Sequence, residues 1–575
     1  MSQDFAKVLV KDDRLMCSDS VKYAVIKGGA NMTCARFNAI GGGAATSVIN
    51  WNIQVPSQET VISRNVLIRT TLAFTIAATT TAYDATIPGS GYVFNYGGID
   101  GFGPFPFHQL VNSAQWTINN NTVSQNTRDI LSVLCRIHDK RQLQRYNGMT
   151  PTMYDVLGDY THIAGSNLNP FASLANASYD NDLLPRGAYP VTIAGANPNY
   201  AAGASARSIT VTIDVCEPVL VSPWTFAGDD SQGMYGLQNL SAIYNLSSGD
   251  TASCVRFGGD LAARFTALPV VTFNGASNSQ LLFQFLTPHP SDLMPSRNVV
   301  PYYEMPRYLS TTVPAIAAGA SATVISSSIQ LSQIPDKLYI TVGLPISASP
   351  TGRDYTCADA WMTITGVSIN WNNTSGLLSS ATQQDLWRMS VENGVNQSWL
   401  EFSGKANGVP TGVAGVGVSS LPTCGSVLCL EFAKDIELRD DYYAPGSLGN
   451  FQLQFQVSVT NNSSKNYDAN VLQLMVITQN GGVFSLERGV ASSYLGVLTK
   501  SDVLEASRQK PDGFSDALRM VGGGSGKVGD FFKRLSSTLG QAAVKHGLPM
   551  LVNAAKAKLG AGKKTNMGSM EDRIY

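Results

Sequence analysis

Charged residues are scarce in this chain of 575 residues. Lys, Arg, Asp and Glu make up 14% of it, against about 25% in a typical soluble protein. Hydrophobic residues make up 44%, which argues against a disordered chain, because disorder needs low hydrophobicity and high charge. A formal net charge of -1 argues against binding of a polyanion over the whole surface. Many small polar and β-branched residues remain, and they predict an all-β fold of large sandwiches.

Long apolar runs are missing too. No stretch approaches about 18 consecutive apolar residues, so no helix is expected to span a bilayer. The opening segment MSQDFAKVLVKDDRLM lacks the apolar core of a signal peptide, and we expect that the protein is not secreted. The eight cysteines are scattered along the chain, which favours buried thiols over a disulfide framework.

Residues for catalysis or metal binding are hard to find. None of the five histidines stands at a Cys or His spacing that suits zinc. Cys424 and Cys429 lie in a strand pattern with no second cysteine pair nearby, so we expect core thiols. The stretch 522–528 departs from a phosphate-binding loop, because Val521 and Val528 replace a required Gly and a required Ser or Thr. No Ser-His-Asp set can be argued. We therefore expect no catalytic residue, no metal site, no cofactor and no enzymatic activity.

Strand signals fill the body of the chain from about residue 46 to 500. Many segments alternate with a period of two and are rich in β-branched and aromatic residues. The clearest are 65–80, 207–215, 281–286, 337–346, 361–371, 426–432, 450–460 and 470–479. Two helices are expected among them. One covers 127–143, which has a single apolar face, and the other covers 379–394, which has a plausible cap and stop.

The two expected helices follow similar strands. Ile118-Asn119 and Ile369-Asn370 are each followed by an Asn-rich turn and then by a helix, and they lie 251 residues apart (369 − 118). The segments 236–240 and 449–453 form a second correspondence, since each begins with Gly and ends with Leu. We interpret these matches as a tandem duplication of one β domain with a helix between two late strands. Chance similarity between degenerate strand sequences is the alternative.

Composition and pattern divide the chain into five parts. An N-terminal arm is expected at 1–45, where strand alternation is weak. One β sandwich is expected at 46–254 and a second at 255–500. A helical segment with a Gly-rich linker is expected at 501–523, and a basic amphipathic tail at 524–575.

Three segments of the second half are more specific. They are SIQLSQIPDKLYITVGLP (328–345), SINWNNTSGLLSSATQQDLWRMSVENG (368–394) and YYAPGSLGNFQLQFQVSV (442–459). They resemble the double jelly-roll major capsid proteins of the bacteriophage–adenovirus lineage of double-stranded DNA viruses. Within that lineage, the closest resemblance is to the polinton-like virus, adintovirus and virophage group.

The resemblance implies an all-β fold of two tandem jelly rolls, at 46–254 and 255–500. It implies a homotrimer whose six jelly rolls form a pseudo-hexagonal capsomer. Many capsomers would tile an icosahedral shell around double-stranded DNA, in contact with neighbouring capsomers and with penton and minor capsid proteins. The protein would reside in the virion after assembly in the cytoplasm or nucleus of a host cell. The arm 1–45 is then the segment expected to reach a neighbouring subunit or the capsid interior.

The same resemblance implies proteolytic processing, because a maturation protease of adenovirus-like systems cuts after Met, Ile or Leu-x-Gly-Gly. This pattern fits the linker at Met520, Gly522, Gly523 and the following Gly524. Two other Gly-rich stretches fit as well, but only this one lies on a flexible linker at a break in composition. We therefore expect that the tail from residue 524 onward is released.

The tail 524–575 differs in charge from the rest of the chain. It has nine Lys or Arg against three Asp or Glu. Its apolar residues recur at helical spacing, among them Phe531, Phe532, Leu535 and Leu539. A basic amphipathic segment of this kind can bind DNA, a membrane surface or a groove on a partner. A helix docked under its own shell is the structural alternative.

A secreted-type β-sandwich carbohydrate-binding protein is the alternative function. It would also be rich in strands, but it should show a signal peptide and clustered carboxylates with aromatic residues. Neither is found in the sequence. A capsid subunit explains the low charge and the duplication, and we predict that function.

Overall fold

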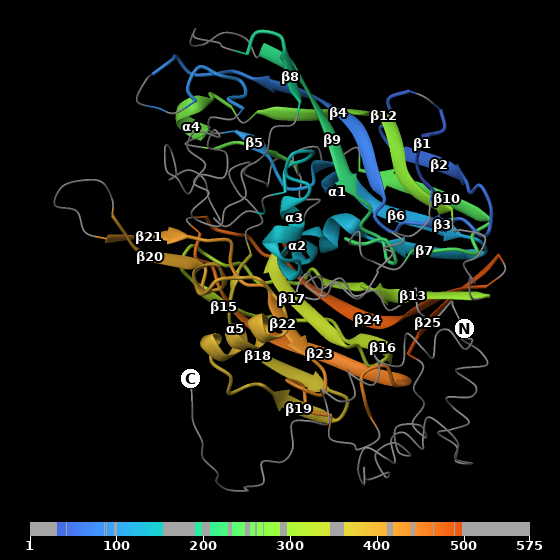
Figure 1. The fold of residues 1–575 in the computed structure, drawn as a ribbon. Coiled ribbons are helices and arrows are strands. Elements are labelled where there is room, and N and C mark those ends of the chain that lie inside the picture. Colours follow the sequence, from blue (N-terminus) through green and yellow to red (C-terminus); the bar gives the residue numbers. More distant parts are fainter. Residues whose placement is uncertain are drawn as a thin grey trace, which may run out of the picture.

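Two β sandwiches make up the described part of the chain (Figure 1). The structure is a computed structural model, and it describes residues 31–496 except 42, 85–86, 88, 97–99, 153, 155–189, 198–206, 228–232, 248–253, 259–260, 268, 288–295, 346–360, 411–417, 439–442, 464 and 488. Most of the expected arm 1–45, the expected segment 501–523 and the tail 524–575 lie outside the described residues.

The first sandwich has two sheets that enclose a hydrophobic core. Their strand orders are β1-β12-β4-β9-β8, with β3 also paired to β12, and β2-β10-β6-β7. Alternating residues of each long strand point into the core, because successive side chains of a strand face opposite sides of the sheet. The strands are β1 (Asn31–Asn38), β2 (Val48–Gln54), β3 (Val61–Ile62), β4 (Leu67–Ala78), β6 (Val111–Ile118), β7 (Asn121–Gln125), β8 (Val191–Ala194), β9 (Arg207–Pro218), β10 (Asn239–Leu246) and β12 (Val270–Thr287).

The second sandwich is built in the same way. One sheet has the order β13-β24-β17-β22, with β14 and β25 also paired to β24, and the other has the order β15-β23-β18-β19, with β16 also paired to β23. The strands are β13 (Arg297–Glu304), β14 (Arg307–Ser310), β15 (Ser321–Ile325), β16 (Ile329–Gln333), β17 (Lys337–Gly343), β18 (Thr363–Trp371), β19 (Thr374–Leu377), β22 (Leu428–Glu431), β23 (Leu448–Thr460), β24 (Gln473–Glu487) and β25 (Val490–Leu495).

Helices and two small ribbons complete the described fold. The ribbons are β5 (Gly101–Phe102) with β11 (Val255–Arg256), and β20 (Lys405–Pro410) with β21 (Val418–Pro422). The helices are α1 (Pro106–Leu110), α2 (Thr127–Ile137), α3 (Lys140–Gln144), α4 (Leu261–Arg264), α5 (Gln383–Glu392) and α6 (Trp399–Phe402). Where one helix was predicted over 127–143, the structure has α2 and α3, because Asp139 caps a new helix.

The two sandwiches share one topology. The larger sheets correspond, as β1-β12-β4-β9 in the first sandwich and β14-β24-β17-β22 in the second, since in each a strand near the start pairs with the long late strand. The second sheets correspond likewise, as β2-β10-β6-β7 and β15-β23-β18-β19. Each is the strand order of a jelly roll, in which Greek-key connections place strands distant in sequence side by side. The predicted all-β fold of two tandem jelly rolls is confirmed.

The turn before each helix repeats as well, but two residues away from the predicted match. Asn119 and Asn372 both have positive φ, at 54° and 50°. The Asn119 side chain accepts hydrogen bonds from the N–H groups of Gln238 (2.8 Å) and Asn239 (3.3 Å), and that of Asn372 accepts one from Gln452 (2.9 Å). The structural offset is therefore 253 residues (372 − 119) rather than 251, because the residue that must adopt positive φ aligns the turns.

Strand pairing moves both expected boundaries of the first jelly roll. β1 pairs with β12 over its whole length, from Asn31 with Thr287 to Asn38 with Gln280. Residues 31–38, expected in the arm 1–45, are thus the first strand of the jelly roll. β12 also pairs with β4, so the first sandwich continues past the expected end at 254 to Thr287.

One strand belongs to both cores. The first half of β24 pairs with β17 and β14 and contributes Leu474 and Val476 to the second core. Its second half pairs with β13 and β25 and contributes Phe484 and Leu486 to the first core. Figure 1 shows β24 crossing the molecule between the two sandwiches. The first core is therefore completed by residues from the end of the second jelly roll.

Candidate assembly surfaces

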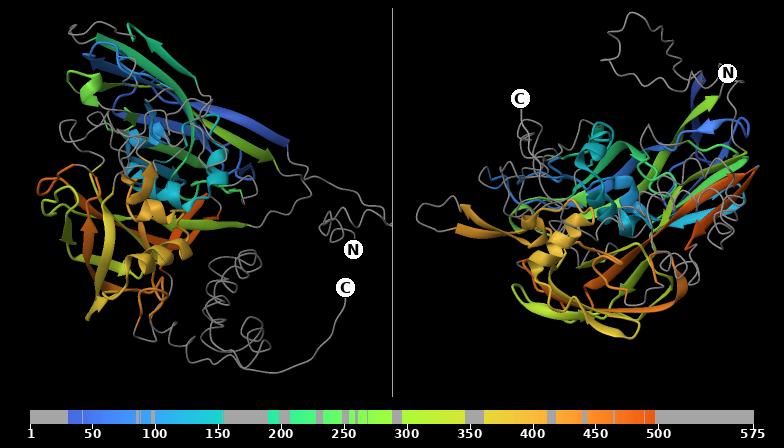
Figure 2. Two further views of the ribbon diagram at one scale, coloured as in Figure 1. Left: turned by 90° about the vertical axis from the view of Figure 1, so that its left-hand side faces the viewer. Right: turned by 60° about the horizontal axis from the view of Figure 1, so that its bottom comes forward.

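A shared hydrophobic cluster joins the two jelly rolls in the described chain. Helix α2 packs against the outer face of the sheet β24-β17-β22. Buried residues of α2 form one hydrophobic cluster with Tyr339, Cys429 and Ile477 of that sheet. Figure 2 shows the helices of the first jelly roll between the two sandwiches. Arg307 of β14 forms an ion pair with Asp129 of α2 at 2.6 Å, which joins the second jelly roll to the first turn of the helix.

Arg136 fastens the other end of α2. Its side chain is fully buried, and its guanidinium lies over the rings of Trp361 (4.2 Å) and Tyr154 (4.8 Å). The guanidinium also donates to the sulfur of Cys424 at 3.7 Å. Stacking of a desolvated guanidinium on an aromatic face is worth about 2 kcal/mol, so this residue holds the first jelly roll to Trp361 and Cys424 of the second.

The interior also holds a carboxyl group that sequence reasoning missed. Glu217 stands at an inward position of β9, and its carboxyl group accepts hydrogen bonds from the N–H groups of Phe107 (2.9 Å) and His108 (3.1 Å) and from the hydroxyl of Thr150 (3.2 Å). Burial raises the pKa of Glu217 to about 8 and lowers the pKa of His108 to about 4. Both side chains are 0% exposed. Such perturbed groups mark active sites when they line a cleft, whereas here they fasten α1 to β9.

A second buried pair closes the far end of the first jelly roll. Arg264 donates two hydrogen bonds to the carboxylate of Asp100, at 2.8 and 2.7 Å, and a third to the carbonyl of Gly258 at 2.6 Å. Asp100 also accepts from the N–H groups of Gly258 and Asn95. Both charged side chains are 0% exposed, and the bidentate geometry compensates their desolvation. A buried Asp in a Gly-rich loop is the only sequence signal of this pair.

Two sheets present outer faces without charge. Throughout the described strands of β2-β10-β6-β7 and of β15-β23-β18-β19 with β16, no Lys, Arg, Asp, Glu or His occurs. The outward positions carry amides and hydroxyls, as in the row Gln452, Gln454 and Gln456 of β23. The other sheet of each sandwich carries charged strand residues, for example Arg36 in the first and Lys337 in the second.

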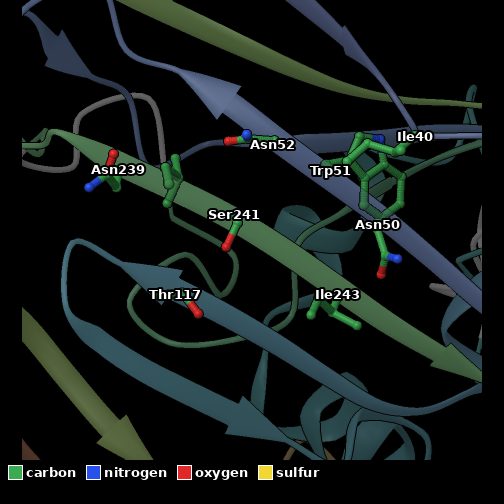
Figure 3. Close-up of a pocket in the computed structure, with 9 residues that line it drawn as sticks. Ile40, Asn50, Trp51, Asn52, Thr117, Asn239, Ser241 and Ile243 are labelled. Carbon is green, nitrogen blue, oxygen red and sulfur yellow. The ribbon is translucent and has the colours of Figure 1, made fainter.

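A shallow pocket of about 400 Å³ lies on the first of these neutral faces (Figure 3). Side chains of β2, β10 and β6 line it, among them Asn50, Asn52, Ser241, Ile243 and Thr117. Its lining combines amides and hydroxyls with the partly exposed Ile243, and none of the described lining side chains is ionisable. The pocket offers hydrogen bonds and a small apolar surface, which suits contact with a neutral protein surface.

The predicted site residues have different outcomes. Cys424 and Cys429 are buried, and burial raises the pKa of each thiol to about 12, so the prediction of core thiols is confirmed. The predicted processing site at Met520–Gly524 lies outside the described residues. Within the described ranges, no three His, Cys, Asp or Glu side chains gather as metal ligands. Over the same ranges, every helix is too short or too polar to cross a bilayer.

Two family models match the chain in succession. The model of the first domain of the Sputnik virophage major capsid protein matches residues 3–286, and that of the C-terminal domain of major capsid protein V20 matches residues 305–482. The chain belongs to the virophage major capsid proteins. The first match ends beside the last residue of β12, so it agrees with the strand pairing of this capsid protein.

Known relatives agree with this assignment. The "Putative capsid protein V20" of Sputnik virophage is 27% identical to this capsid protein over 545 residues, which cover 93% of this chain and 86% of the relative. A chain of the Sputnik virophage structure determined by cryo-EM is 26% identical and has a TM-score of 0.72. The match covers 89% of this chain and 97% of the Sputnik chain.

The mavirus major capsid protein shares the fold. Its crystal structure is 17% identical to this capsid protein, with a TM-score of 0.67 and coverage of 86% of this chain and 97% of the mavirus chain. The relatives are structural capsid proteins, which confirms the prediction that the chain is not an enzyme. The capsid protein is a component of the virion, and the carbohydrate-binding alternative is set aside.

Proposed function

We propose that this capsid protein forms homotrimers, that each trimer is a capsomer of six jelly rolls, and that the capsomers tile an icosahedral shell around double-stranded DNA. The observation that carries the proposal is the contact between the two jelly rolls. It joins a helix of the first to a sheet of the second, so it is heterologous. Heterologous contacts between similar units close into rings when the rotation permits, and three chains with two jelly rolls each supply six units.

The neutral faces support close assembly of many copies. Two sheets per chain have no charged strand residue, and the formal net charge of the chain is -1. Identical surfaces with little charge approach each other without strong repulsion. We propose that these faces contact neighbouring capsomers in the shell, and that penton and minor capsid proteins complete it.

The proposal also includes processing and the tail. A maturation protease would cut at the linker around Met520, Gly522, Gly523 and Gly524, and it would release 524–575. Before release, the excess of Lys and Arg in this tail would contact DNA or a membrane surface. Intact mass spectrometry of protein from mature particles tests this step. A full-length C-terminus in those particles would contradict it.

Mass in solution tests the trimer. Light scattering after size exclusion should give three times 61.3 kDa, or about 184 kDa. A monomer at all concentrations would contradict the proposed capsomer. Electron microscopy of the same preparation under assembly conditions, and of infected cells, then tests the closed shell and whether it forms in the cytoplasm or the nucleus.

A further inference from the structure

One helix of the first jelly roll and one sheet of the second form the contact between them. Each of these elements is buried on both sides, once by its own jelly roll and once by the other. In α2, nine of the eleven residues are buried, because its own jelly roll covers one side and the second jelly roll covers the other. In β17, six of seven residues are buried, because the core lies on one face and α2 on the other.

The equivalent helix of the second jelly roll and the equivalent sheet of the first jelly roll each leave one side exposed to solvent. Along the chain, α5 follows β19 and precedes β22, just as α2 follows β7 and precedes β9. Only Leu386 and Ser390 of α5 are buried, and Val391 is 42% exposed. Strand β4, the equivalent of β17, buries only alternate residues. Figure 1 shows α2 between the sandwiches and α5 on the second sandwich.

Register identifies which open residues correspond to the buried contact. Asn239 and Gln452, which meet the two turn asparagines, differ by 213 positions (452 − 239), and so do Cys216 and Cys429 (429 − 216). Cys429 lies beside Tyr339 of β17, and Cys216 lies beside Arg69 of β4. Tyr339 and Cys429 are buried by α2, whereas Arg69 is exposed and Cys216 is half-buried.

Charged residues occur near equivalent positions, with a shift of two residues on the strand. Asp129 is the third residue of α2 and forms the ion pair with Arg307 of β14. Asp385 is the third residue of α5. Strand β1, the equivalent of β14, carries Arg36 on its outer, exposed face. The register equivalent of Arg307 is Asn38, and Arg36 is the next outward residue of the same strand. The carboxylate of Asp385 accepts hydrogen bonds from Thr382 and lies 3.9 Å from Arg388 of its own helix, but within the described chain it has no partner on a facing sheet.

We propose that α5 of one chain packs on the outer face of β1, β4 and β9 of the next chain. This contact repeats between chains the one that α2 makes within the chain, and Asp385 then faces Arg36 of the neighbouring copy. The inference rests on the proposed trimer and names its interface. Other copies of the chain cover the exposed side of α5 and the outer face of β1, β4 and β9. The reason is that the chain already makes the same kind of helix-to-sheet contact between its own jelly rolls.

Native cysteines make the proposal testable by cross-linking. Cys34 lies on β1, on the same outer face as Arg36, and is exposed. Gln384→Cys places a thiol beside Asp385 on the exposed side of α5. The background carries Cys17→Ser, Cys216→Ser and Cys357→Ser, because the half-buried Cys216 lies on the same outer face, on β9. A short bismaleimide should link full-length Gln384→Cys subunits into covalent dimers and trimers on a denaturing gel, and Cys34→Ser should abolish the link.

The matched control is Gln456→Cys on the neutral face of β23, because Gln456 is exposed as Gln384 is. It should give no link to Cys34. A protein that is trimeric by light scattering but links only through Gln456→Cys, or through neither variant, overturns this interface and leaves the trimer standing. A protein that is monomeric by light scattering overturns the proposed trimer, and the interface with it.

Charge reversal provides a second test that needs no cross-linking reagent. Arg36→Glu places an acid opposite Asp385 and should eliminate the trimer peak in light scattering, while the melting temperature of the subunit stays within about 2 °C. Gln456→Glu adds a charge of the same sign to the neutral face and should retain the trimer. Loss of the trimer in Gln456→Glu, with retention in Arg36→Glu, would overturn the proposed interface.

Discussion

Individual buried charges stabilise this capsid protein through their partners. Asp100→Asn removes the anion that holds Arg264. We expect it to lower the free energy of unfolding by about 3–5 kcal/mol, because it leaves a buried cation without compensation. The control is Glu392→Gln, since Glu392 forms exposed ion pairs with Arg388 and Lys434, each at 3.8 Å, and their loss should cost about 1 kcal/mol at most. Urea unfolding at pH 7 compares the two, and equal midpoints would contradict the expectation.

Glu217 should make stability depend on pH. Its pKa is about 8 in the folded chain against 4.5 as its ordinary value, so the folded state retains a proton that the unfolded state releases. The free energy of unfolding therefore falls as pH rises between these values. His108, with its pKa lowered from 6.5 to about 4, opposes this trend only below about pH 6.5. Between about pH 6.5 and 8, the Glu217 contribution falls alone, by about 2 kcal/mol.

The variant that isolates this contribution is Glu217→Gln, which cannot release a proton. Scanning calorimetry from pH 6 to 8.5 should show a falling melting temperature for the native protein and a flatter profile for the variant. The comparison concerns slopes, because the amide also loses one of the two acceptor oxygens that bind Phe107 and His108. Parallel profiles would show that Glu217 is ionised in the fold at neutral pH.

At the scale of elements, the turn asparagines carry the equivalent hairpins. Asn119→Ala should cost about 2–4 kcal/mol, since it combines a strained positive φ with the loss of buried hydrogen bonds. Asn119→Gly should cost less, because Gly accepts positive φ. Asn372→Ala should cost less than Asn119→Ala, since Asn372 is exposed. Chemical denaturation of the three variants gives the order, and an Ala variant as stable as the Gly variant would contradict it.

Local patterns in the sequence predicted the elements better than their connections. The start of α5 was predictable, because Thr382 and Asp385 form a capping box. The duplication was predictable from the two Asn-rich turns. The register was not, because Ile369-Asn370 copies the letters of Ile118-Asn119 but only positive φ at Asn372 shows which asparagine makes the turn.

The long-range pairs were beyond sequence reasoning. Arg264 and Asp100 are 164 positions apart, and nothing local identifies them as partners. The end of the first jelly roll was misplaced at 254 for a similar reason. β12 follows a long connection and pairs with β1, which lies at the other end of the domain in sequence. An alternating pattern predicts a strand but does not show which strand it pairs with. Glu217 left one signal, a carboxyl group at an inward position of an alternating strand.

At the scale of the whole molecule, the jelly rolls depend on each other. The first core includes Val300, Phe484, Leu486 and Ala491 of the second. A fragment that ends at Thr287 lacks them and exposes their partners to water. We expect this fragment to bind a hydrophobic dye strongly and to lack near-ultraviolet circular dichroism, whereas residues 31–496 should fold. A fragment with a cooperative thermal transition would contradict this dependence.

The shared strand β24 also determines how the subunit bears load. A force that separates the two sandwiches acts along a strand whose halves are hydrogen-bonded into different sheets. Separation must therefore shear many hydrogen bonds at once, since β24 runs as one strand from Gln473 to Glu487. In the proposed DNA-filled shell, outward pressure would pull on each subunit, and β24 would act as a tie between its two jelly rolls.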